Sequence, residues 1–255
     1  MLADKFRLDG KVAIVAGAGK GIGQCIGLAF AEAGANVVFA ARTECDIQAN
    51  AEKARAFGIK SMAVPCDVKD DKQLQALAEK TMQAFGKIDI LVNVAGGATP
   101  NPIQKTNRMR FNEAFDFNVT CAFSLTRICL PHLKASKGCV INITSAAGRV
   151  IQPNYSAYGS VKAALNFLTR LMASELAPDV RVNAIAPGAI TTDALTGYLD
   201  PASLEKMAEL TPMKRLGEPL DIALGALYLA SPAARCVTGK ILEIDGGMEK
   251  TNVPS

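Results

Sequence analysis

The sequence predicts an α/β protein of one domain, residues 1–255, built on a doubly wound parallel sheet of about seven strands. Three observations favour this fold class. Seven short apolar runs alternate with longer segments of helical spacing, a glycine-rich turn follows the first run, and no linker divides the 255 residues. Such alternation places helices on both faces of a parallel sheet. A barrel of eight βα units is the alternative, and seven runs with that first turn favour the open sheet.

The expected strands are runs rich in β-branched residues, as strands buried on both faces require. They are "KVAIVAG" from Lys11, "NVVFAA" from Asn36, "SMAVPC" from Ser61, "IDILVNVAG" from Ile88, "GCVINITS" from Gly138, "VRVNAIAPG" from Val180 and "KILEIDGG" from Lys240. The expected helices show apolar residues on one face. They cover residues 22–33, segments that begin at 45 and 71, and residues 110–135, 155–177 and 219–230.

The stretch 191–213 is too long for a simple connection, so we expect a substrate-binding loop or a small helical lid within the domain. Four large apolar residues in it suit a bulky apolar substrate or plain packing: Leu195, Tyr198, Leu199 and Met207.

Composition argues against several classes of partner. The net charge is only +4 with no basic block, and aromatic residues make up 5%, so neither a nucleic-acid footprint nor a base-stacking platform is expected. No apolar run approaches the roughly 18 residues that span a bilayer, and "MLADKFRLDG" has no signal-peptide pattern. The seven cysteines lack CxxC spacing and His132 is the only histidine. We therefore expect a cytoplasmic protein with reduced thiols, no metal site and no membrane contact.

The first expected strand ends in "AGAGKGIG", which places Gly17, Gly19, Gly21 and Gly23 at a strand-to-helix turn. Glycines let a phosphate approach backbone N–H groups, and the helix N-terminus adds a partial positive charge. The spacing differs from GxGxxG, and Lys20 is followed by Gly21, so this is not a P-loop. Its position in the chain predicts a dinucleotide site.

The end of the second expected strand predicts which dinucleotide binds. An NAD site usually has an acidic residue there for the ribose 2′-hydroxyl, but this chain has Arg42, and its first acids, Glu44 and Asp46, fall within the next helix. Arg42 and Lys20 suit a 2′-phosphate, which a carboxylate would repel. We therefore predict NADP(H) in preference to NAD(H).

A tyrosine and a lysine in "NYSAYGSVK" have the spacing of a catalytic pair. Tyr158 and Lys162 are four residues apart, one helical turn, whereas Tyr155 has Gly159 at that distance. A free tyrosine has a pKa of about 10, which a neighbouring cation lowers. Ser145 ends the fifth strand run near the carboxyl edge of the sheet, where it can donate to a substrate oxygen beside Tyr158.

At this point the sequence resembles the short-chain dehydrogenase/reductase family over nearly its whole length. The match consists of Gly17-x-x-x-Gly21-x-Gly23, "NVAG" at 93–96, Asn118, Ser145, Tyr158-x-x-x-Lys162 and Pro187-Gly188, in the family's order and spacing. The family is Rossmann-like, NAD(P)-dependent and usually homotetrameric. Ala16 and Val94 replace its frequent Thr and Asn, which removes local support of the cofactor but no catalytic group.

The resemblance implies a role for each matched residue. Tyr158 would be the general acid/base, Lys162 would lower its pKa and bind the nicotinamide ribose, Ser145 would hold the substrate oxygen, and Asn118 would position a relay water. The remaining implied cofactor contacts are Gly17, Gly19, Gly21, Ile22, Gly23, Asp67 at adenine, Val68, Asn93, Ala95, Gly96, Pro187, Gly188, and Ile190 and Thr192 at the carboxamide.

The sequence says less about the substrate than about the family. Segments such as "LVNVAGGATP" and "APGAITTDAL" look similar to bacterial 7α-hydroxysteroid dehydrogenases within this family. A 3-oxoacyl-[acyl-carrier-protein] reductase is the alternative, and it would need a basic patch near the pocket, for which Arg108, Arg110, Arg149 and Lys214 are candidates. A protein that senses NADP(H) without catalysis is a further alternative, against which the complete set of four catalytic residues argues.

Overall fold

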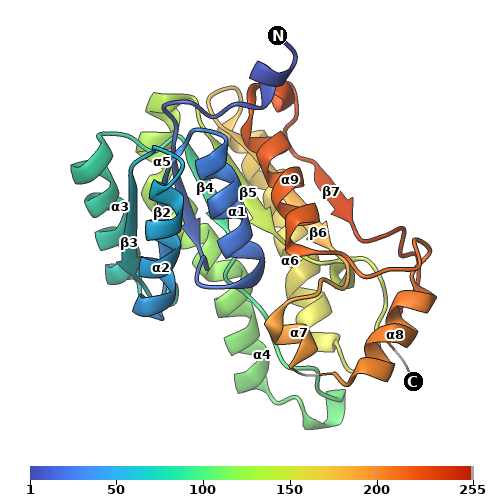
Figure 1. Cartoon of the computed structure of the whole chain (residues 1–255). Coiled ribbons are helices and arrows are strands. Elements are labelled where there is room, and N and C mark those ends of the chain that lie inside the picture. Colours follow the sequence, from blue (N-terminus) through green and yellow to red (C-terminus); the bar gives the residue numbers. More distant parts are fainter. Residues whose placement is uncertain (198, 254–255) are drawn as a thin grey trace.

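The computed structural model describes residues 1–197 and 199–253. Its seven strands form one parallel sheet in the order β3-β2-β1-β4-β5-β6-β7, which confirms the predicted fold class (Figure 1). The proposed lid residue Tyr198 and the last two residues of the predicted domain lie outside the described residues. No helix in the described part of the chain is long and apolar enough to cross a bilayer.

The strands and main helices alternate along the chain, and their bounds lie within a few residues of the predicted segments. The strands are β1 Val12–Ala16, β2 Asn36–Ala41, β3 Ser61–Pro65, β4 Ile90–Asn93, β5 Cys139–Ile143, β6 Arg181–Pro187 and β7 Ile241–Ile244. The helices are α1 Gly21–Glu32, α2 Glu44–Arg55, α3 Asp71–Phe85, α4 Arg108–Phe115, α5 Cys121–Ser136, α6 Ser156–Leu176, α7 Asp193–Thr196, α8 Pro201–Leu210 and α9 Pro219–Ala230.

Local sequence signals set several helix ends. Asp70 accepts hydrogen bonds from the backbone N–H groups of Lys72 and Gln73 at the start of α3, and Gly86 ends that helix in the left-handed conformation. At α9, Glu218 and Asp221 form a reciprocal capping box. These caps satisfy backbone groups that a helix leaves unpaired at its ends, and so they fix where the chain turns back to the sheet.

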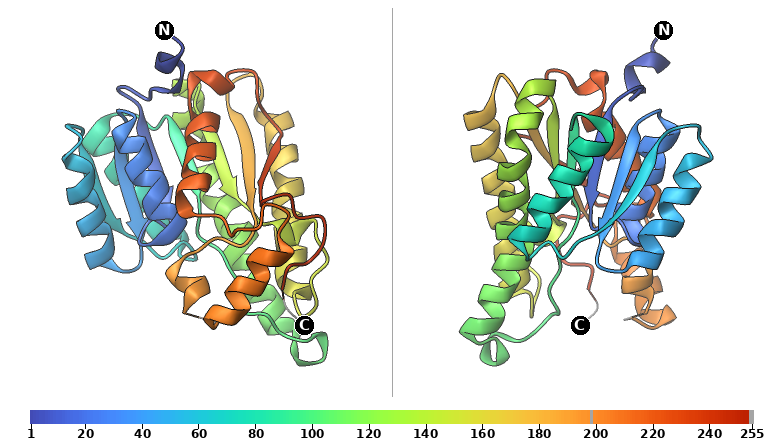
Figure 2. Two further views of the ribbon diagram at one scale, coloured as in Figure 1. Left: turned by 45° about the vertical axis from the view of Figure 1, so that its right-hand side comes forward. Right: turned by 90° about the vertical axis from the view of Figure 1, so that its left-hand side faces the viewer.

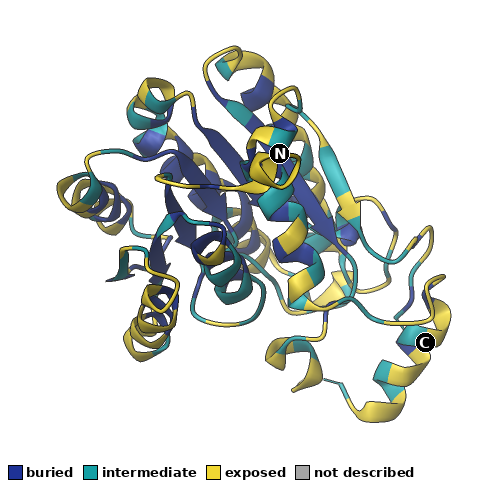
Figure 3. Ribbon diagram, turned by 45° about the horizontal axis from the view of Figure 1, so that its top comes forward, coloured by how far each residue is buried: buried dark blue, intermediate teal, exposed yellow. Residues whose placement is uncertain are grey.

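Two helical layers cover the sheet, as the right-hand view in Figure 2 shows. One face packs against α1, α2 and α9 through residues such as Phe30, Ile47 and Ile222. The opposite face packs against α3, α5 and α6 through residues such as Leu77, Leu125 and Met172. The central strands are almost wholly buried, whereas the outer helix faces are exposed (Figure 3). Burial of the strands on both faces agrees with the unbroken apolar runs that encode them in the sequence.

The long predicted helix over residues 110–135 is interrupted. A π-helical turn, Asp116–Thr120, joins α4 to α5 and carries Asn118. Single π turns inside helices are frequent at functional sites because they redirect a side chain. The predicted lid stretch holds α7 and α8, at the same end of the molecule as α4 (Figure 1). Strand order reverses between β1 and β4, and open sheets bind ligands beyond the carboxyl ends of strands at such a point.

Candidate active site

The glycine-rich turn lies at the reversal point between β1 and β4. Gly17 has φ +95° and Gly21 has φ +56°, which side-chain-bearing residues rarely adopt. A Cβ on Gly17 would lie 2.6 Å from the Ala95 nitrogen, and one on Gly23 would lie 2.1 Å from the Gly17 carbonyl oxygen. The turn therefore needs glycine for its own packing as well as for ligand access.

A cleft of about 420 Å³ opens above this turn. Lys20, the N-cap of α1, makes no side-chain hydrogen bond to the first turn of the helix, so those N–H groups remain available to a phosphate. The cleft therefore fits the pyrophosphate of a dinucleotide. The residues predicted for the cofactor that line it are Gly17, Gly19, Lys20, Gly21, Ile22, Gly23, Arg42, Asp67, Val68, Ala95, Gly96 and Thr192.

Six residues predicted to contact the cofactor do not line this cleft; two of them, Tyr158 and Lys162, lie on α6 and are described below, and the other four lie elsewhere. The Asn93 side chain is buried and donates to the Asn142 amide oxygen at 2.9 Å, because the strand directs it into the core. Pro187 ends β6 and Gly188 follows, held by a hydrogen bond from its N–H to the Ile244 carbonyl. Ile190 is buried and lines a smaller cavity of about 90 Å³ beside Gly217.

Sequence reasoning missed an acidic residue in the cleft. Asp46, in the first turn of α2, lines the cavity, and its carboxylate lies 3.8 Å from the Lys20 ammonium. The sequence shows Asp46 in the helix that follows the second strand. It does not show that the Asp46 side chain points into the cleft. Arg42 also lines the cleft, is exposed, and has no ion pair within the described part of the chain. Of Lys20 and Arg42, only Arg42 has no acidic partner among the described residues.

Tyr158 and Ser145 come together at the carboxyl end of β5. Ser145 caps a short 3₁₀ turn, where its hydroxyl accepts a hydrogen bond from the Ala147 N–H at 3.1 Å. Burial raises the pKa of Tyr158 above its ordinary value, and hydrogen bonding with the Ser145 side chain opposes that rise. Tyr155 packs edge-on against Tyr158, with ring centroids 5.9 Å apart.

Lys162 lies behind Tyr158 on the same face of α6. Its ammonium is 5.6 Å from the centre of the Tyr158 ring and donates a hydrogen bond to the Ile143 carbonyl at 3.1 Å. Lys162 is only 3% exposed, and burial lowers its pKa to about 8. The sequence argument expected the lysine to lower the pKa of Tyr158. In the protein without cofactor the pKa of Tyr158 is raised instead, chiefly because burial disfavours the phenolate.

Asn118 projects from the π turn towards the loop after β4. Its amide oxygen accepts from the Gly97 N–H at 2.9 Å, and its amide nitrogen donates to the carbonyl oxygens of Gly97 at 3.0 Å and Ala114 at 2.8 Å. A Cβ on Gly96 would lie 2.7 Å from the Asn118 amide oxygen and 3.0 Å from the Lys162 ammonium. The two side chains therefore approach the same point on the backbone.

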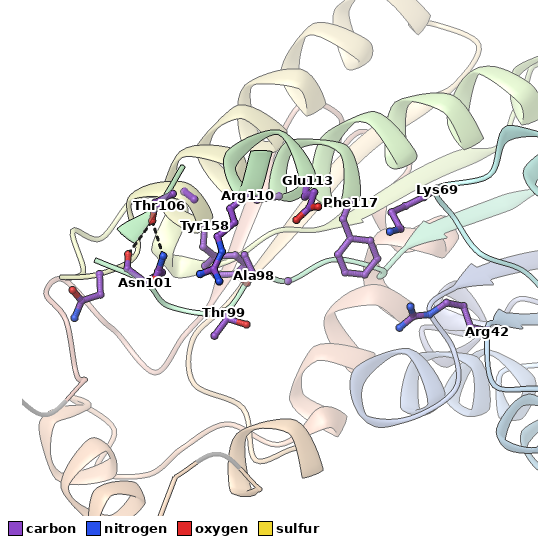
Figure 4. Close-up of a pocket in the computed structure, with 14 residues that line it drawn as sticks. Arg42, Lys69, Ala98, Thr99, Asn101, Thr106, Arg110, Glu113, Phe117 and Tyr158 are labelled. Atoms are coloured by element: carbon purple, nitrogen blue, oxygen red, sulfur yellow. Dashed lines mark hydrogen bonds between the residues drawn. The ribbon is translucent and has the colours of Figure 1, made fainter. Parts of the chain in front are cut away.

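A second cavity of about 540 Å³ has Tyr158 in its wall (Figure 4). It shares Arg42 and Phe117 with the glycine-lined cleft, so the two cavities adjoin. Its lining is mixed, with small apolar residues from the loop after β4, charged residues from α4, and the start of α6. This arrangement places a proton donor and acceptor in the wall of a space large enough for a small molecule, which adjoins the glycine-lined cleft. Among the described residues, no group of three metal-ligating side chains gathers.

Comparisons with known proteins agree with this geometry. Residues 17–249 match the family model described as enoyl-(acyl carrier protein) reductase. The chain is 43% identical over 252 residues to the 7α-hydroxysteroid dehydrogenase of Escherichia coli K12, with 96% of each protein covered.

Solved structures extend the likeness to three dimensions. A 7α-hydroxysteroid dehydrogenase complexed with NADH and 7-oxo glycochenodeoxycholic acid matches with a TM-score of 0.93 at 42% identity, over 96% of each chain. A gluconate 5-dehydrogenase from Burkholderia cenocepacia, in complex with NADP and tartrate, matches with a TM-score of 0.90 at 30% identity, over 97% of this chain and 98% of that one. Fold, motifs and relatives agree, and the chain belongs to the short-chain dehydrogenase/reductase family of NAD(P)-dependent oxidoreductases.

Proposed function

We propose that this protein interconverts a secondary alcohol and a ketone with NADP(H), and that its substrate is a 7α-hydroxysteroid. The observation that carries the proposal is the position of Tyr158, in the wall of one cavity that adjoins the glycine-lined cleft, with Ser145 and Lys162 beside it. The steroid is supported by the relative and the solved structure named above.

Tyr158 moves the proton. In the reducing direction its hydroxyl donates to the carbonyl oxygen, and in the oxidising direction its phenolate accepts the proton of the alcohol. Ser145 holds the same oxygen by donating its hydroxyl hydrogen, which fixes the reacting carbon in one orientation. The nicotinamide, when bound, supplies or accepts the hydride.

Lys162 and Asn118 serve the proton path. The buried ammonium favours the phenolate once substrate and cofactor are in place, and it can also donate to the hydroxyls of the nicotinamide ribose. Because the Asn118 amide oxygen and the Lys162 ammonium both approach Gly96, a water between them could return the proton to solvent. Asn118 uses both amide hydrogens on backbone carbonyls, so only its oxygen is left to accept from that water.

NADP(H) is supported by Arg42, which lines the cleft and has no ion pair in the described part of the chain. A guanidinium there can bind a 2′-phosphate with two hydrogen bonds. Lys20 contributes less than the sequence suggested, because Asp46 lies 3.8 Å from its ammonium. NADP(H) preference therefore rests chiefly on Arg42.

A steady-state panel tests this function: 7α- and 7β-hydroxysteroid acids, simple secondary alcohols and an acetoacetyl thioester, each with NADP and NAD. We expect the highest kcat/KM for a 7α-hydroxysteroid with NADP. Tyr158→Phe should lower kcat by about 10²–10⁴-fold and leave NADP⁺ binding intact, whereas Tyr155→Phe should have the smaller effect.

Three outcomes would point elsewhere. Strong preference for the acetoacetyl thioester would favour a 3-oxoacyl reductase. Tight NADP(H) binding without turnover of any substrate would favour a sensor. Largely intact activity in Tyr158→Phe would remove the acid/base role of Tyr158.

We also propose a homotetramer, as the family resemblance suggests. Large apolar side chains stay exposed along α4, α5 and α6, namely Met109, Phe111, Phe115, Phe123, Phe167 and Leu171. Helix faces of this kind are typical of subunit interfaces. Light scattering coupled to size-exclusion chromatography measures the assembly directly, and a monomer would contradict it.

A further inference from the structure

Four basic residues suggested by the sequence for a carrier-binding patch have different surroundings in the structure. Arg149 forms ion pairs with Glu243 at 3.0 Å, Asp245 at 3.0 Å and Glu249 at 2.9 Å. The Lys214 ammonium donates to the Glu209 carbonyl. Arg149 is therefore neutralised and adds no free charge to a basic patch.

Arg110 alone of these four lines the cavity that holds Tyr158. It lies on α4 on the side that also gives Ala114 and Phe117 to the cavity wall, at spacings of four and seven residues. Figure 4 shows its guanidinium directed towards the region of Ala98 and Tyr158. No carboxylate in the described part of the chain forms an ion pair with it, although Glu113 lines the same cavity.

The other basic residues of this cavity lie apart from Arg110. Arg42 and Lys69 line its far side, next to the glycine-lined cleft (Figure 4). A 2′-phosphate bound there would occupy Arg42. Of the basic residues that line this cavity, Arg110 is then the one on the Tyr158 side, and no carboxylate among the described residues pairs with it. Its guanidinium suits a planar anion because it presents two parallel donors.

From this arrangement, and resting on the proposed function, we propose that Arg110 determines specificity for an acidic substrate: its guanidinium binds the substrate carboxylate while the reacting carbon faces Tyr158. A single unpaired arginine suits one small anionic group. An acidic carrier protein would need several free cations around the pocket mouth, and Arg149 is not free.

Matched substrates test the inference on the NADP-loaded enzyme. Each pair is a hydroxysteroid acid and its primary carboxamide, which differ in charge and hardly in shape. We expect wild type to have a kcat/KM about tenfold higher for the acid, the order of one charge contact near a protein surface. Raising the ionic strength from about 0.05 to 0.5 M should shrink that ratio.

Arg110→Met, which keeps much of the stem, should raise KM for the acid about tenfold and leave KM for the carboxamide unchanged. Arg110→Lys should retain part of the preference. Arg108→Met, on the same helix but outside the cavity lining, is the matched control and should behave as wild type.

The inference is overturned if wild type uses acid and carboxamide equally, prefers the carboxamide or uses neither, or if the preference for the acid survives Arg110→Met. An acetoacetyl carrier protein reduced faster than the free thioester, with that advantage lost in Arg108→Met, would also overturn it. Failure of the acid/base role proposed for Tyr158 is a separate result, because both members of each pair would then stay active in Tyr158→Phe.

Discussion

Asn118 and Gly97 exchange two hydrogen bonds, one from the Gly97 N–H to the amide oxygen at 2.9 Å and one from the amide nitrogen to the Gly97 carbonyl at 3.0 Å. The pair joins the π turn between α4 and α5 to the loop that lines both cavities. Because Asn118 is fully buried, no solvent can replace these bonds when the side chain is shortened.

Asn118→Ala should therefore lower both stability and activity. The unpaired backbone groups should cost about 1–3 kcal/mol in the free energy of unfolding, and kcat should fall because the loop and the water path lose their support. Asn118→Asp keeps the acceptor for the Gly97 N–H and should be less unstable. Urea titration and steady-state kinetics measure both effects, and wild-type values in Asn118→Ala would contradict them.

NADP⁺ should lower the pKa of Tyr158. In the free protein burial raises that pKa, so the phenolate should not form at neutral pH. A bound positive nicotinamide favours the phenolate and should shift its titration to lower pH. The difference in tyrosinate absorbance between wild type and Tyr158→Phe reports this group, and Tyr155→Phe controls for its neighbour. A midpoint unchanged by NADP⁺ would refute the coupling.

Lys162 should make stability depend on pH. Burial lowers its native pKa to about 8, whereas the unfolded side chain titrates at its ordinary value of 10.5. Between these values the unfolded state binds more protons, so the free energy of unfolding should rise with pH in that window and stay flat below it. Relative to Lys162→Met, the rise should be about 3 kcal/mol. Urea titrations at several pH values would show it, and a parallel pH dependence in both proteins would count against it.

Asp46→Asn should strengthen the preference for NADP⁺. The change removes a carboxylate 3.8 Å from the Lys20 ammonium, so that Lys20 becomes free for a 2′-phosphate.

Arg42→Ala should reduce the preference for NADP⁺, because it should weaken NADP⁺ binding about tenfold with little effect on NAD⁺ binding. Separate titrations of the two cofactors measure this, with Lys53→Ala on the outer end of α2 as control. NAD⁺ binding as tight as NADP⁺ binding in wild type would reject the cofactor proposal.

Arg149→Met should loosen the loop that follows β5 and carries Ser145. Arg149 lies four residues beyond Ser145 and ties that loop to the end of β7 and the segment after it, through three carboxylates and the Met248 carbonyl. Asp245, which is only 6% exposed, would lose its ion pair and keep only its backbone hydrogen bonds from Gly247 and Met248. We expect about 1–2 kcal/mol lower stability, discounted for the partly exposed guanidinium, and a higher KM. Arg235→Met, exposed and distant, is the control. An unchanged KM and an unchanged thermal midpoint would show that the Arg149 ion pairs contribute neither to substrate binding nor to stability.

The sequence alone predicted the sheet and its flanking helices, and it singled out Tyr158 as the proposed acid/base. Alternating apolar runs suffice for the fold because a parallel sheet buried on both faces requires them. The choice of Tyr158 over Tyr155 followed from helical spacing, since only Tyr158 has a lysine one turn onward. The glycine turn was also readable, because few residues besides glycine adopt the positive φ of Gly17 and Gly21.

Tertiary structure alone decided which charges meet. The sequence could not show that Asp46 faces Lys20, that three carboxylates surround Arg149, or that Arg110 lines the cavity with no ion pair to another described residue. Nor could it show that Lys162 is buried deeply enough to lower its own pKa. The reason is physical. Local periodicity fixes backbone elements over a few residues, whereas burial and Coulomb interactions depend on side chains that the fold gathers from distant parts of the chain.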